Sequence, residues 1–502
     1  MNYSKYYNLN KYYLFISILF NIIIVYINNA KQINPTNIPE LNYYNNQTLK
    51  FLFQSKTCPL TLFLFSDMKK YNDSFQIKEI NLRDKDYFIT YFEQDYNYRQ
   101  YYEILRKNGL IKSNYKYGKH NLFISKLFND YFSGKNYDIY DLDKFQKVYR
   151  FYSCYYLFNK NIFYKFYAQM KTHFYKEFNF MPETYIYPEQ KDLIFNKFKN
   201  YNIDLNNLWM VKPNDKWAGI GITLFNSLKT IKLKEFVITK YITNLNLIKG
   251  KKYDLRLYAL ITGLKPLRIY FYNEGTARIA SEKYYFNKSF IGNKYMHLTN
   301  IDLNKNNKNY INPNTTNDYN SNMYNILMYE KYLKQLNIEY SDIKEKIKDL
   351  IIKSIISVYR NLTEENQRFN ISDRSFYNLL GFDILITDKF EPILCEINYN
   401  PTMEIHNIFE KENKTNLFLD TLNLIGIIPY SKISKKPLKN EIKFKRDIDD
   451  SINNAFCELE RPKGGYELIF PLKENINKYK KYFIYNIEEN KLFWSKILLD
   501  SF

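Results

Sequence analysis

Two carboxylates and a carboxamide occur close together in the stretch 381–402, GFDILITDKFEPILCEINYNPT. Apolar and polar residues alternate on each side of residues 389–390, which predicts two strands joined by a two-residue turn. Counting outward from this turn places Asp383 opposite Glu396, with Cβ atoms about 5 Å apart. Asn398 adds a neutral oxygen on the same face. Such hard oxygen donors suit Mg²⁺ carried on a nucleotide, whereas a solvated hairpin with polar outer residues is the alternative.

Basic residues that could hold phosphate groups come earlier in the chain. Lys212 stands at the end of a predicted strand, 208–211, and precedes a loop that contains Gly219 and Gly221. A lysine ammonium and bare backbone N–H groups can bind a phosphate together. A plain hairpin would also explain this pattern.

A longer strand is predicted at 251–263, and its period of two places Lys252, Asp254 and Arg256 on one face. Three ionisable residues on one face are unusual for a purely structural strand. The other face carries Leu255, Leu257 and Ala259. The next stretch, 267–279, is predicted to be a hairpin that turns at Asn273-Glu274-Gly275 and carries Arg278 on its returning arm.

These candidate residues need a rigid framework, for which the sequence predicts an α/β body. Shorter strands are expected at 222–225 and 236–242. A helix is expected at 341–361, with Ser341 as its N-cap, and its apolar face should pack against the sheet behind the 381–402 hairpin. That face consists of Ile343, Ile347, Ile351, Ile355 and Val358.

The composition is that of a globular protein with a strong positive charge. The 502 residues are 45% hydrophobic and 25% charged, with a formal net charge of +21. This charge predicts salt-sensitive attraction to nucleic acid, an anionic membrane or an acidic protein tail. Four cysteines, at positions 58, 154, 395 and 457, show no CxxC spacing. Their scatter argues against a disulfide scaffold or a zinc site and favours a reducing compartment.

The chain divides by sequence into four segments. Residues 1–30 contain an apolar run, 14–27, that is similar to the apolar part of a signal peptide and short for a membrane span. A compositionally biased extension is the alternative, and membrane contact is expected only through this run. No motif occurs in 31–140, and the nucleotide-binding pattern lies in 141–430. Residues 431–502 are predicted to be a linker and a basic C-terminal extension.

Two further stretches are distinguished by their composition. Aromatic residues are interleaved with Lys and Arg between 145 and 176, which indicates either base stacking or, more commonly, a core of aromatic side chains. Asparagine dominates 304–322, which is predicted to be a mobile loop.

A resemblance to a known family, the tubulin-tyrosine-ligase-like enzymes, lies in four stretches. They are WMVKPN and GIGI within 209–222, KGKKYDLRLYALITGLKPLRIYFYNEGTARIASEKY at 249–284, GNKYMHLTN at 292–300, and GFDILITD with EPILCEINYNP within 381–401. These ligases join carboxylates to amines and add amino acids to tubulin tails. The resemblance covers roughly 176–430 and implies an α/β (α+β) fold of the ATP-grasp type with an N-terminal lobe. KEFNFMPETYIYP at 176–188 and TLNLIGIIP at 421–429 are most similar to the polyglutamylase branch.

The resemblance implies roles for individual residues. Those implied to act on the phosphates and the acyl phosphate are Lys252, Arg256 and Arg278. Those implied to bind ATP are Lys212, Gly219, Gly221, Lys240, Asp254, Thr299 and Asn300. The implied magnesium ligands are Asp383, Glu396 and Asn398, which the hairpin pattern also predicts. Two positions depart from the family pattern: Ala218 replaces a frequent arginine and Thr239 a frequent glutamine, near the phosphates and the adenine respectively.

The implied function is that of an ATP- and Mg²⁺-dependent tubulin polyglutamylase. The tubulin glutamate side chain would become an acyl phosphate, and the amine of free glutamate would attack it. Tubulin or microtubules are the expected partner, without nucleic acid, in the cytoplasm and cytoskeleton, including a cilium or basal body. The run 14–27 leaves a secretory location open. A sister ligase adding glycine or tyrosine, and a non-catalytic microtubule-binding relative, are the alternatives. The pattern does not distinguish α- from β-tubulin or initiation from elongation.

Overall fold

The protein is described by a computed structural model that divides it into two units, Met1–Thr48 and Leu49–Phe502. All described residues belong to the second unit, and the run 14–27 lies outside them. They are 50–54, 61–64, 76–80, 87–88, 90–93, 105, 111–112, 121–124, 146–199, 208–214, 219–224, 234–285, 287, 291–315, 317–368, 375–428, 430–431, 447–484 and 488–499. Within these ranges, none of the helices has both the length and the hydropathy needed to cross a membrane.

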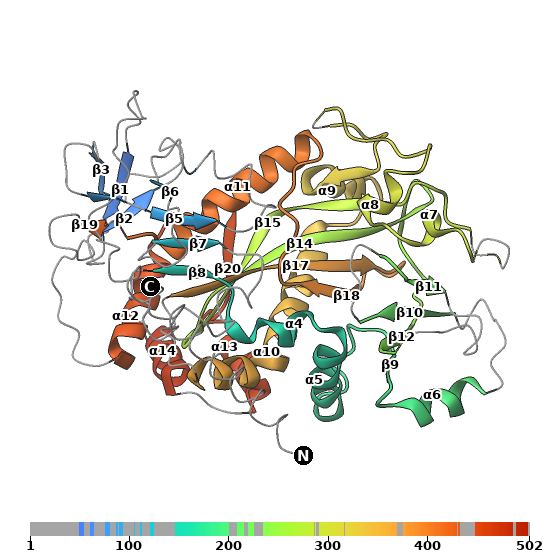
Figure 1. Ribbon diagram of the computed structural model, residues 1–502, viewed down its shortest axis with the longest axis horizontal. Helices are drawn as coiled ribbons and strands as arrows, with labels where there is room; N and C mark the ends of the chain where they lie inside the picture. Colours follow the sequence, from blue (N-terminus) through green and yellow to red (C-terminus); the bar gives the residue numbers. More distant parts are fainter. Residues whose placement is uncertain are drawn as a thin grey trace, which may run out of the picture. The chain divides into compact units, whose positions relative to one another are not determined.

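A large mixed sheet forms the body of this unit. Its strands follow the order β16-β15-β14-β17-β8-β7-β5-β6, while β13, β18 and β20 pair with β14, β17 and β15. The antiparallel strands β14, β15 and β17 run side by side (Figure 1). The strands are β5 Thr90–Glu93, β6 Ile111–Lys112, β7 Leu122–Ile124, β8 Lys147–Tyr149, β13 Leu247–Ile248, β14 Lys251–Leu264, β15 Leu267–Ile279, β16 Met323–Asn325, β17 Phe376–Ile386, β18 Pro392–Asn398 and β20 Tyr466–Phe470.

A small antiparallel sheet, in the order β11-β10-β12-β9, carries Lys212 on its strand β10. Its strands are β9 Thr184–Tyr187, β10 Trp209–Pro213, β11 Thr223–Leu224 and β12 Phe236–Lys240. Helix α6, Lys191–Phe198, packs Ile194 and Phe198 against Trp209 and Ile238 of this sheet. The strands predicted around 208–211, 222–225 and 236–242 therefore exist, with small shifts at their ends.

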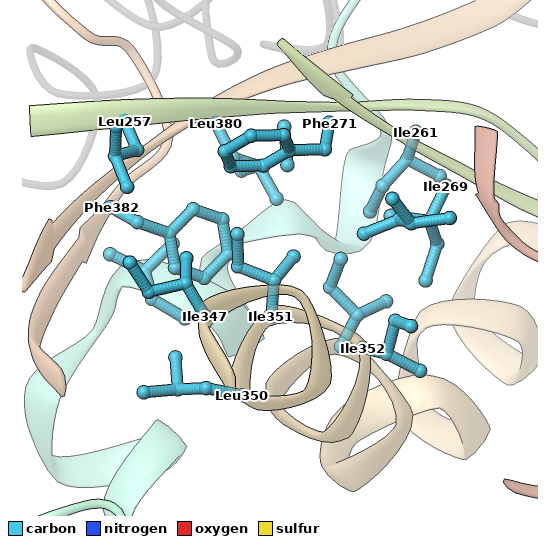
Figure 2. Close-up of a cluster of buried hydrophobic side chains, with 14 of the residues drawn as sticks. Leu257, Ile261, Ile269, Phe271, Ile347, Leu350, Ile351, Ile352, Leu380 and Phe382 are labelled. Atoms are coloured by element: carbon cyan, nitrogen blue, oxygen red, sulfur yellow. The ribbon is translucent and has the colours of Figure 1, made fainter. Parts of the chain in front are cut away.

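Helix α10, Tyr340–Arg368, covers one face of the central strands, as its apolar stripe predicts. Figure 2 shows Ile347 and Ile351 of the helix against Phe382 of β17 and Leu257 of β14. The helix begins at Tyr340, so Ser341 lies within its first turn and the prediction that Ser341 is the N-cap is wrong. Tyr340 is itself part of the same core.

Strand β15 differs from the hairpin predicted at 267–279. It is one continuous strand that pairs with β14 along its length, and the hairpin lies between these two strands at Lys265 and Pro266. The register shifts between Leu257–Gly275 and Tyr258–Tyr272, so the turn-like residues Asn273 and Glu274 form a bulge. Bulges and turns favour the same residue types, which is why the composition indicated a turn here.

The C-terminal residues are built into the large sheet. Strand β20 pairs with β15, from Ile269–Phe470 to Tyr272–Tyr466. The surrounding elements are α12 Asp447–Leu459, α13 Ile476–Tyr479, η9 Lys480–Tyr482 and α14 Glu488–Leu499. Phe493 and Trp494 of α14 belong to the same core as α10. The sequence pattern did not indicate this role for the extension.

The aromatic stretch before 176 forms core, in line with the commoner interpretation. Phe163, Tyr167 and Met170 of helix α5 are buried, and Tyr167 packs edge-on against Phe180. Helix α5 spans Lys160–His173 and follows η5 Tyr152–Cys154 and α4 Tyr155–Phe158. Other elements are β1 Lys50–Gln54, β2 Thr61–Leu64, β3 Gln76–Ile80, β4 Tyr87–Phe88, β19 Tyr430–Ser431, α7 Lys294–His297, α8 Ile301–Asn304, α9 Ile326–Gln335 and α11 Ile408–Ile425.

The asparagine-rich stretch 304–322, whose mobility stays a prediction, is tied at both ends to residues that follow β15. Asn304 Oδ1 accepts hydrogen bonds from Ser281 N and Oγ at 2.9 and 2.7 Å. Asn322 Nδ2 donates to the carbonyl oxygen of Ala280 at 2.9 Å. Buried carboxamides thus replace the backbone pairing that an irregular segment lacks.

The cysteines are not all reduced. Cys154 and Cys395 are free thiols, whereas Cys457 is disulfide-bonded, which the scattered spacing did not predict.

Candidate active site

A pocket lies between the small sheet and the central strands of the large sheet, and it collects most of the predicted residues. Helix α5, the loop after β12 and residues 297–300 complete its walls. The predicted residues that line it are Lys212, Gly219, Lys240, Lys252, Asp254, Arg278, Thr299, Asn300, Asp383 and Glu396. Three predicted residues do not line the pocket but lie directly beside residues that do: Arg256, Gly221 and Asn398.

The floor of the pocket is a row of cross-strand neighbours. The alternation of β14 turns Lys252, Asp254 and Arg256 toward the pocket, while Leu255 and Leu257 enter the core with α10. Asp254 is paired in register with Arg278 of β15, and Arg256 with Asp383 of β17. Directly opposed residues of antiparallel strands have adjacent side chains, so the register alone brings two arginines and two aspartates together.

These four side chains form a buried network without net charge. Arg256 donates from Nε and Nη2 to the two oxygens of Asp383 at 2.5 and 3.0 Å. Arg278 Nη2 lies 3.0 Å from Asp383 Oδ2, and Arg278 Nε donates to Asp254 Oδ1 at 3.0 Å. Burial alone would raise the pKa of Asp383, but the two guanidinium groups hold it well below its usual range. Asp383 is therefore a fixed carboxylate.

The 381–402 hairpin has the predicted pairing of Asp383 with Glu396, but its turn and its register differ from the prediction. The connection is longer than two residues, because Ile386 pairs with Pro392. The register then shifts between Asp383 and Ile384, where Cys395 is the extra residue of a bulge. The predicted two-residue turn is thus wrong, and the bulge compensates for it.

The donor set on this hairpin fits a magnesium ion. The Asn398 carboxamide nitrogen lies 3.4 Å from Asp383 Oδ2 and 3.5 Å from Glu396 Oε1, so three oxygen-bearing groups converge. Within the described ranges, no group of three or more His, Cys, Asp or Glu side chains could hold a metal by itself. Two carboxylates completed by phosphate oxygens and water are the usual surroundings of Mg²⁺. Glu396 is still accessible, with 30% of its side chain exposed.

The glycine loop closes one side of the pocket. Gly219 and Gly221 have φ of +76° and +75°, a region that disfavours residues with a side chain. A Cβ atom on Gly219 would lie 2.9 Å from Asn300 Oδ1, and one on Gly221 would lie 2.9 Å from Pro213 Cγ. Both glycines are therefore required where the loop approaches its neighbours. Ala218, the departure from the family pattern, lies outside the described residues.

The other departure, Thr239, has a clear place in the structure. It lies on β12, lines the pocket and is buried. Thr184 of β9 donates its hydroxyl to the Thr239 hydroxyl at 3.1 Å. Thr239 therefore joins the two strands at the base of the small sheet.

Cations line the pocket on three sides. Lys212 and Lys240 come from the small sheet, Lys252 from β14 and Lys160 from the first turn of α5. Lys160 Nζ lies 3.9 Å from Glu396 Oε2. Burial lowers the pKa of Lys252 to about 8. With the floor neutral, these ammonium groups make the pocket attractive to phosphates.

Sequence reasoning missed several lining residues. Lys160 follows Asn159, whose side chain caps α5, but no pattern connects this helix start with the hairpin more than 200 residues later. Tyr241, His297 and Cys395 also line the pocket and were not singled out for it. His297 and Cys395 stand inside stretches that carried the family resemblance, so their neighbours were a usable signal. Tyr241 lies outside these stretches.

The family assignment follows from comparison with known proteins. The model of the tubulin-tyrosine ligase family matches residues 140–437, which is more than half of the chain. The chain belongs to this family. The match includes the small sheet, the strands β14, β15, β17 and β18 of the large sheet, and the 381–402 hairpin.

Its similar relatives are named as glutamylases. The tubulin monoglutamylase TTLL4 of Homo sapiens is 32% identical over 254 residues, which are 50% of this chain and 21% of that protein. The tubulin polyglutamylase TTLL5 of Homo sapiens is 31% identical over 303 residues, 59% of this chain and 23% of that protein. A probable beta-tubulin polyglutamylase of Tetrahymena thermophila is 28% identical over 377 residues, 69% and 31% of the two chains. The matched region is thus a minor part of each relative's length.

Proposed function

We propose that this chain is an ATP-dependent ligase that joins free glutamate to glutamate side chains in tubulin tails. The observation that carries the proposal is the meeting of Asp383 and Glu396 with Lys212, Lys252 and Arg278 in one pocket. Paired oxygen donors beside several cations suit a metal-bound triphosphate. The glutamylases among the relatives support glutamate as the amino acid that is joined.

The reaction would proceed in two steps. The tubulin carboxylate attacks the γ-phosphorus of ATP, which gives an acyl phosphate and ADP. The amine of glutamate then attacks the acyl carbon, loses a proton and expels phosphate, which leaves an isopeptide bond. Both steps develop negative charge on oxygens, and fixed cations stabilise such charge without a covalent enzyme intermediate.

The residues of the pocket divide this work. Lys212, Lys240 and Lys252 would bind the phosphates, and Thr299 and Asn300 would contact the nucleotide beside the glycine loop. Arg256 and Arg278 hold Asp383 in place, and Arg278 also faces the pocket. Asp383, Glu396 and Asn398 would hold magnesium, which supplies neutralisation of the phosphate oxygens when bound.

The proposed substrate fits the charge of the chain. A net charge of +21 favours an acidic partner, and tubulin tails are rich in glutamate. Location on microtubules in the cytoplasm, including a cilium or basal body, belongs to the same proposal. A tag placed after Phe502 tests the location: labelling of the secretory pathway would remove cytosolic tubulin as a substrate.

The activity test offers labelled glutamate, glycine and tyrosine separately to the purified full-length chain with ATP, Mg²⁺ and microtubules. Incorporation of glutamate alone is expected, and microtubules stripped of their acidic tails should accept none. Incorporation of glycine or tyrosine alone would replace the glutamylase by a sister ligase. ATP binding without any incorporation would favour a non-catalytic microtubule-binding protein.

A further inference from the structure

Three buried polar side chains form a chain of hydrogen bonds along one wall of the pocket. The Lys252 ammonium donates to the Tyr241 hydroxyl at 3.2 Å, and this hydroxyl lies 2.9 Å from Nδ1 of His297. The residues come from β14, the loop after β12 and α7, and each is 5% exposed. The proposed chemistry uses Lys252 but does not explain why Tyr241 and His297 are joined to it.

Counting protons shows which arrangement of this chain uses every hydrogen. An ammonium group only donates, and a tyrosine hydroxyl carries one hydrogen. Because Lys252 donates to the Tyr241 oxygen, the Tyr241 hydrogen is free to point to Nδ1 of His297. When the Tyr241 hydrogen points to Nδ1, that nitrogen carries a lone pair, and His297 is neutral with its proton on Nε2.

A second proton on His297 would break this arrangement. Nδ1 would then donate to the same Tyr241 oxygen, and the Tyr241 hydrogen would lose Nδ1 as its acceptor in a buried place. Two cations, Lys252 and His297, would also face one another across a single oxygen atom. Both consequences are unfavourable in a site with little water.

We propose that Tyr241 and His297 are positioning residues that hold the Lys252 ammonium at the phosphate site, and that protonation of His297 releases Lys252 from this position. The inference rests on the proposed function, in which Lys252 binds the nucleotide. Its consequence is a nucleotide affinity that falls at acid pH because Lys252 is no longer held at the phosphate site.

The groups around Lys252 determine up to which pH its side chain stays charged. Burial is the largest influence and lowers the pKa of Lys252 to about 8. Cys395 and Asp254 favour its charge, and Lys212 opposes it. The Tyr241 ring also lies under the ammonium, with 4.5 Å between Nζ and the ring centroid. Lys252 is thus charged at neutral pH and remains sensitive to an added positive charge.

The groups around Tyr241 and His297 affect the protons of these two side chains. Burial raises the pKa of Tyr241 well above its usual value, and Tyr284 acts in the same direction, so the Tyr241 hydroxyl keeps its proton. The His297 ring meets the edges of the Tyr241 and Tyr284 rings, with centroids 5.5 and 6.0 Å apart. Burial and the facing Lys252 ammonium both disfavour a second proton on His297, so the chain should be complete at neutral pH and break only in acid.

The decisive variant is His297→Gln. A glutamine carbonyl can accept the Tyr241 hydrogen but does not titrate, whereas His173→Gln removes an exposed histidine on α5 as the matched control. The measurement is the Kd of a fluorescent ATP analogue for the full-length protein from pH 5.5 to 7.5. Wild type and His173→Gln should bind about 10-fold more weakly at pH 5.5 than at pH 7.5. His297→Gln should lose most of this ratio.

The outcomes separate the inference from the function on which it rests. The same acid weakening in His297→Gln as in wild type would overturn the inference and leave the proposed function standing. A wild-type protein that binds no nucleotide at any pH would overturn both.

Tyr241→Phe provides a second test, because it keeps the ring below Lys252 and removes only the hydroxyl. Its affinity at pH 7.5 should fall about 10-fold, and an unchanged affinity would overturn the inference. The chain has four histidines, so nitrogen NMR of labelled histidine can be assigned with His297→Gln. At pH 7.5 the His297 signal should show an unprotonated Nδ1, and a protonated Nδ1 would also contradict the proposal.

Discussion

Two buried arginine–carboxylate clusters stand at opposite ends of the β14–β15 hairpin. The open cluster consists of Arg256, Arg278, Asp254 and Asp383 and faces the pocket. The closed cluster consists of Arg268, Thr262 and Glu458, and its three members are not among the residues that line the pocket. The same two strands therefore hold a candidate active site at one end and a structural ion pair at the other.

The closed cluster is satisfied within itself. Arg268 donates from Nε and Nη2 to the two oxygens of Glu458 at 2.9 and 3.2 Å, and from Nη1 to the carbonyl of Pro266 at 2.7 Å. Thr262 donates its hydroxyl to Glu458 as well. Both charged side chains are 2% exposed. This pair joins α12 of the C-terminal extension to the central hairpin.

The open cluster has the same internal pairing but different neighbours. Beside it stand Glu396, Lys252 and Lys160, which are not balanced by the four central charges. Arginine–carboxylate pairing and burial are therefore common to both clusters and do not identify a site. What distinguishes the open cluster is the accessible carboxylate and the cations next to it, which are available to a ligand.

Arg268→Met tests whether the closed cluster is structural. The change leaves Glu458 buried without its main partner, which should lower the free energy of unfolding by about 3 to 5 kcal/mol. Denaturant unfolding measures this loss. Arg360→Met is the control, because Arg360 forms an exposed pair with Glu364 on α10, and its loss should be about 0.5 kcal/mol or less. Equal losses in the two variants would contradict the assignment.

Glu396→Gln tests whether the accessible carboxylate beside the open cluster acts in transfer. Loss of one proposed magnesium ligand should reduce glutamate transfer about 100-fold or more. The unfolding midpoint should not change, because the Glu396 side chain is 30% exposed and its nearest described cation is 3.9 Å away. Glu391→Gln, in the turn of the same hairpin, is the matched control. Normal turnover in Glu396→Gln would show that the metal assignment is wrong.

The open cluster was largely predictable because its information is local. Lys252, Asp254 and Arg256 share one strand face, and a period of two is enough to place them together. The pairing of Asp383 with Glu396 was also predicted, although the predicted turn was too short and an unforeseen bulge at Cys395 corrected the register. Pairing of adjacent strands depends on few residues, so an error in turn length shifts the register by only a residue or so.

The closed cluster was not predictable, because its partners are far apart in sequence. Arg268 and Glu458 are 190 positions apart, and β20 joins β15 across a similar distance. No periodicity connects such segments, and only the packing of the whole unit brings them together. Lys160 is brought to the pocket in the same way, from a stretch whose composition indicated an aromatic core or base stacking. The bulge at Asn273 and Glu274 was misread because its residues also favour turns.

Two glycines beside the clusters give a third test. A Cβ atom on Gly263 would lie 2.3 Å from Arg268 Nη2, whereas one on Gly381 would lie 3.0 Å from Pro401 Cβ and 3.4 Å from Arg256 Cδ. Gly263→Ala should therefore cost about 2 kcal/mol of unfolding free energy, and Gly381→Ala less than about 1 kcal/mol. Denaturant unfolding of both variants measures the difference. A larger cost at Gly381 would show that the open cluster is the more tightly packed one.

The smallest expected effect is the pH dependence of the unfolding free energy. It should be the same for both clusters. The pKa of Asp383 in the folded protein is held below its unfolded value by Arg256 and Arg278. Such a carboxylate contributes stability above the unfolded pKa, near 3.9, and loses it as the pH falls toward the folded pKa. The stability gap between wild type and Asp383→Asn should therefore narrow by about 1 kcal/mol from pH 5 to pH 3.

Glu458→Gln completes this test, because the pKa of Glu458 is also lowered, against burial, by Arg268 and Arg461. Its gap to wild type should narrow over the same pH range in unfolding experiments. A gap that widens with acid in either variant would contradict the ion-pair assignment of that cluster. Matching behaviour would show that the clusters are alike as buried ion pairs. Their difference would then lie in access to the pocket, because Glu396 beside the open cluster should alter transfer without altering stability, whereas the closed cluster should affect stability.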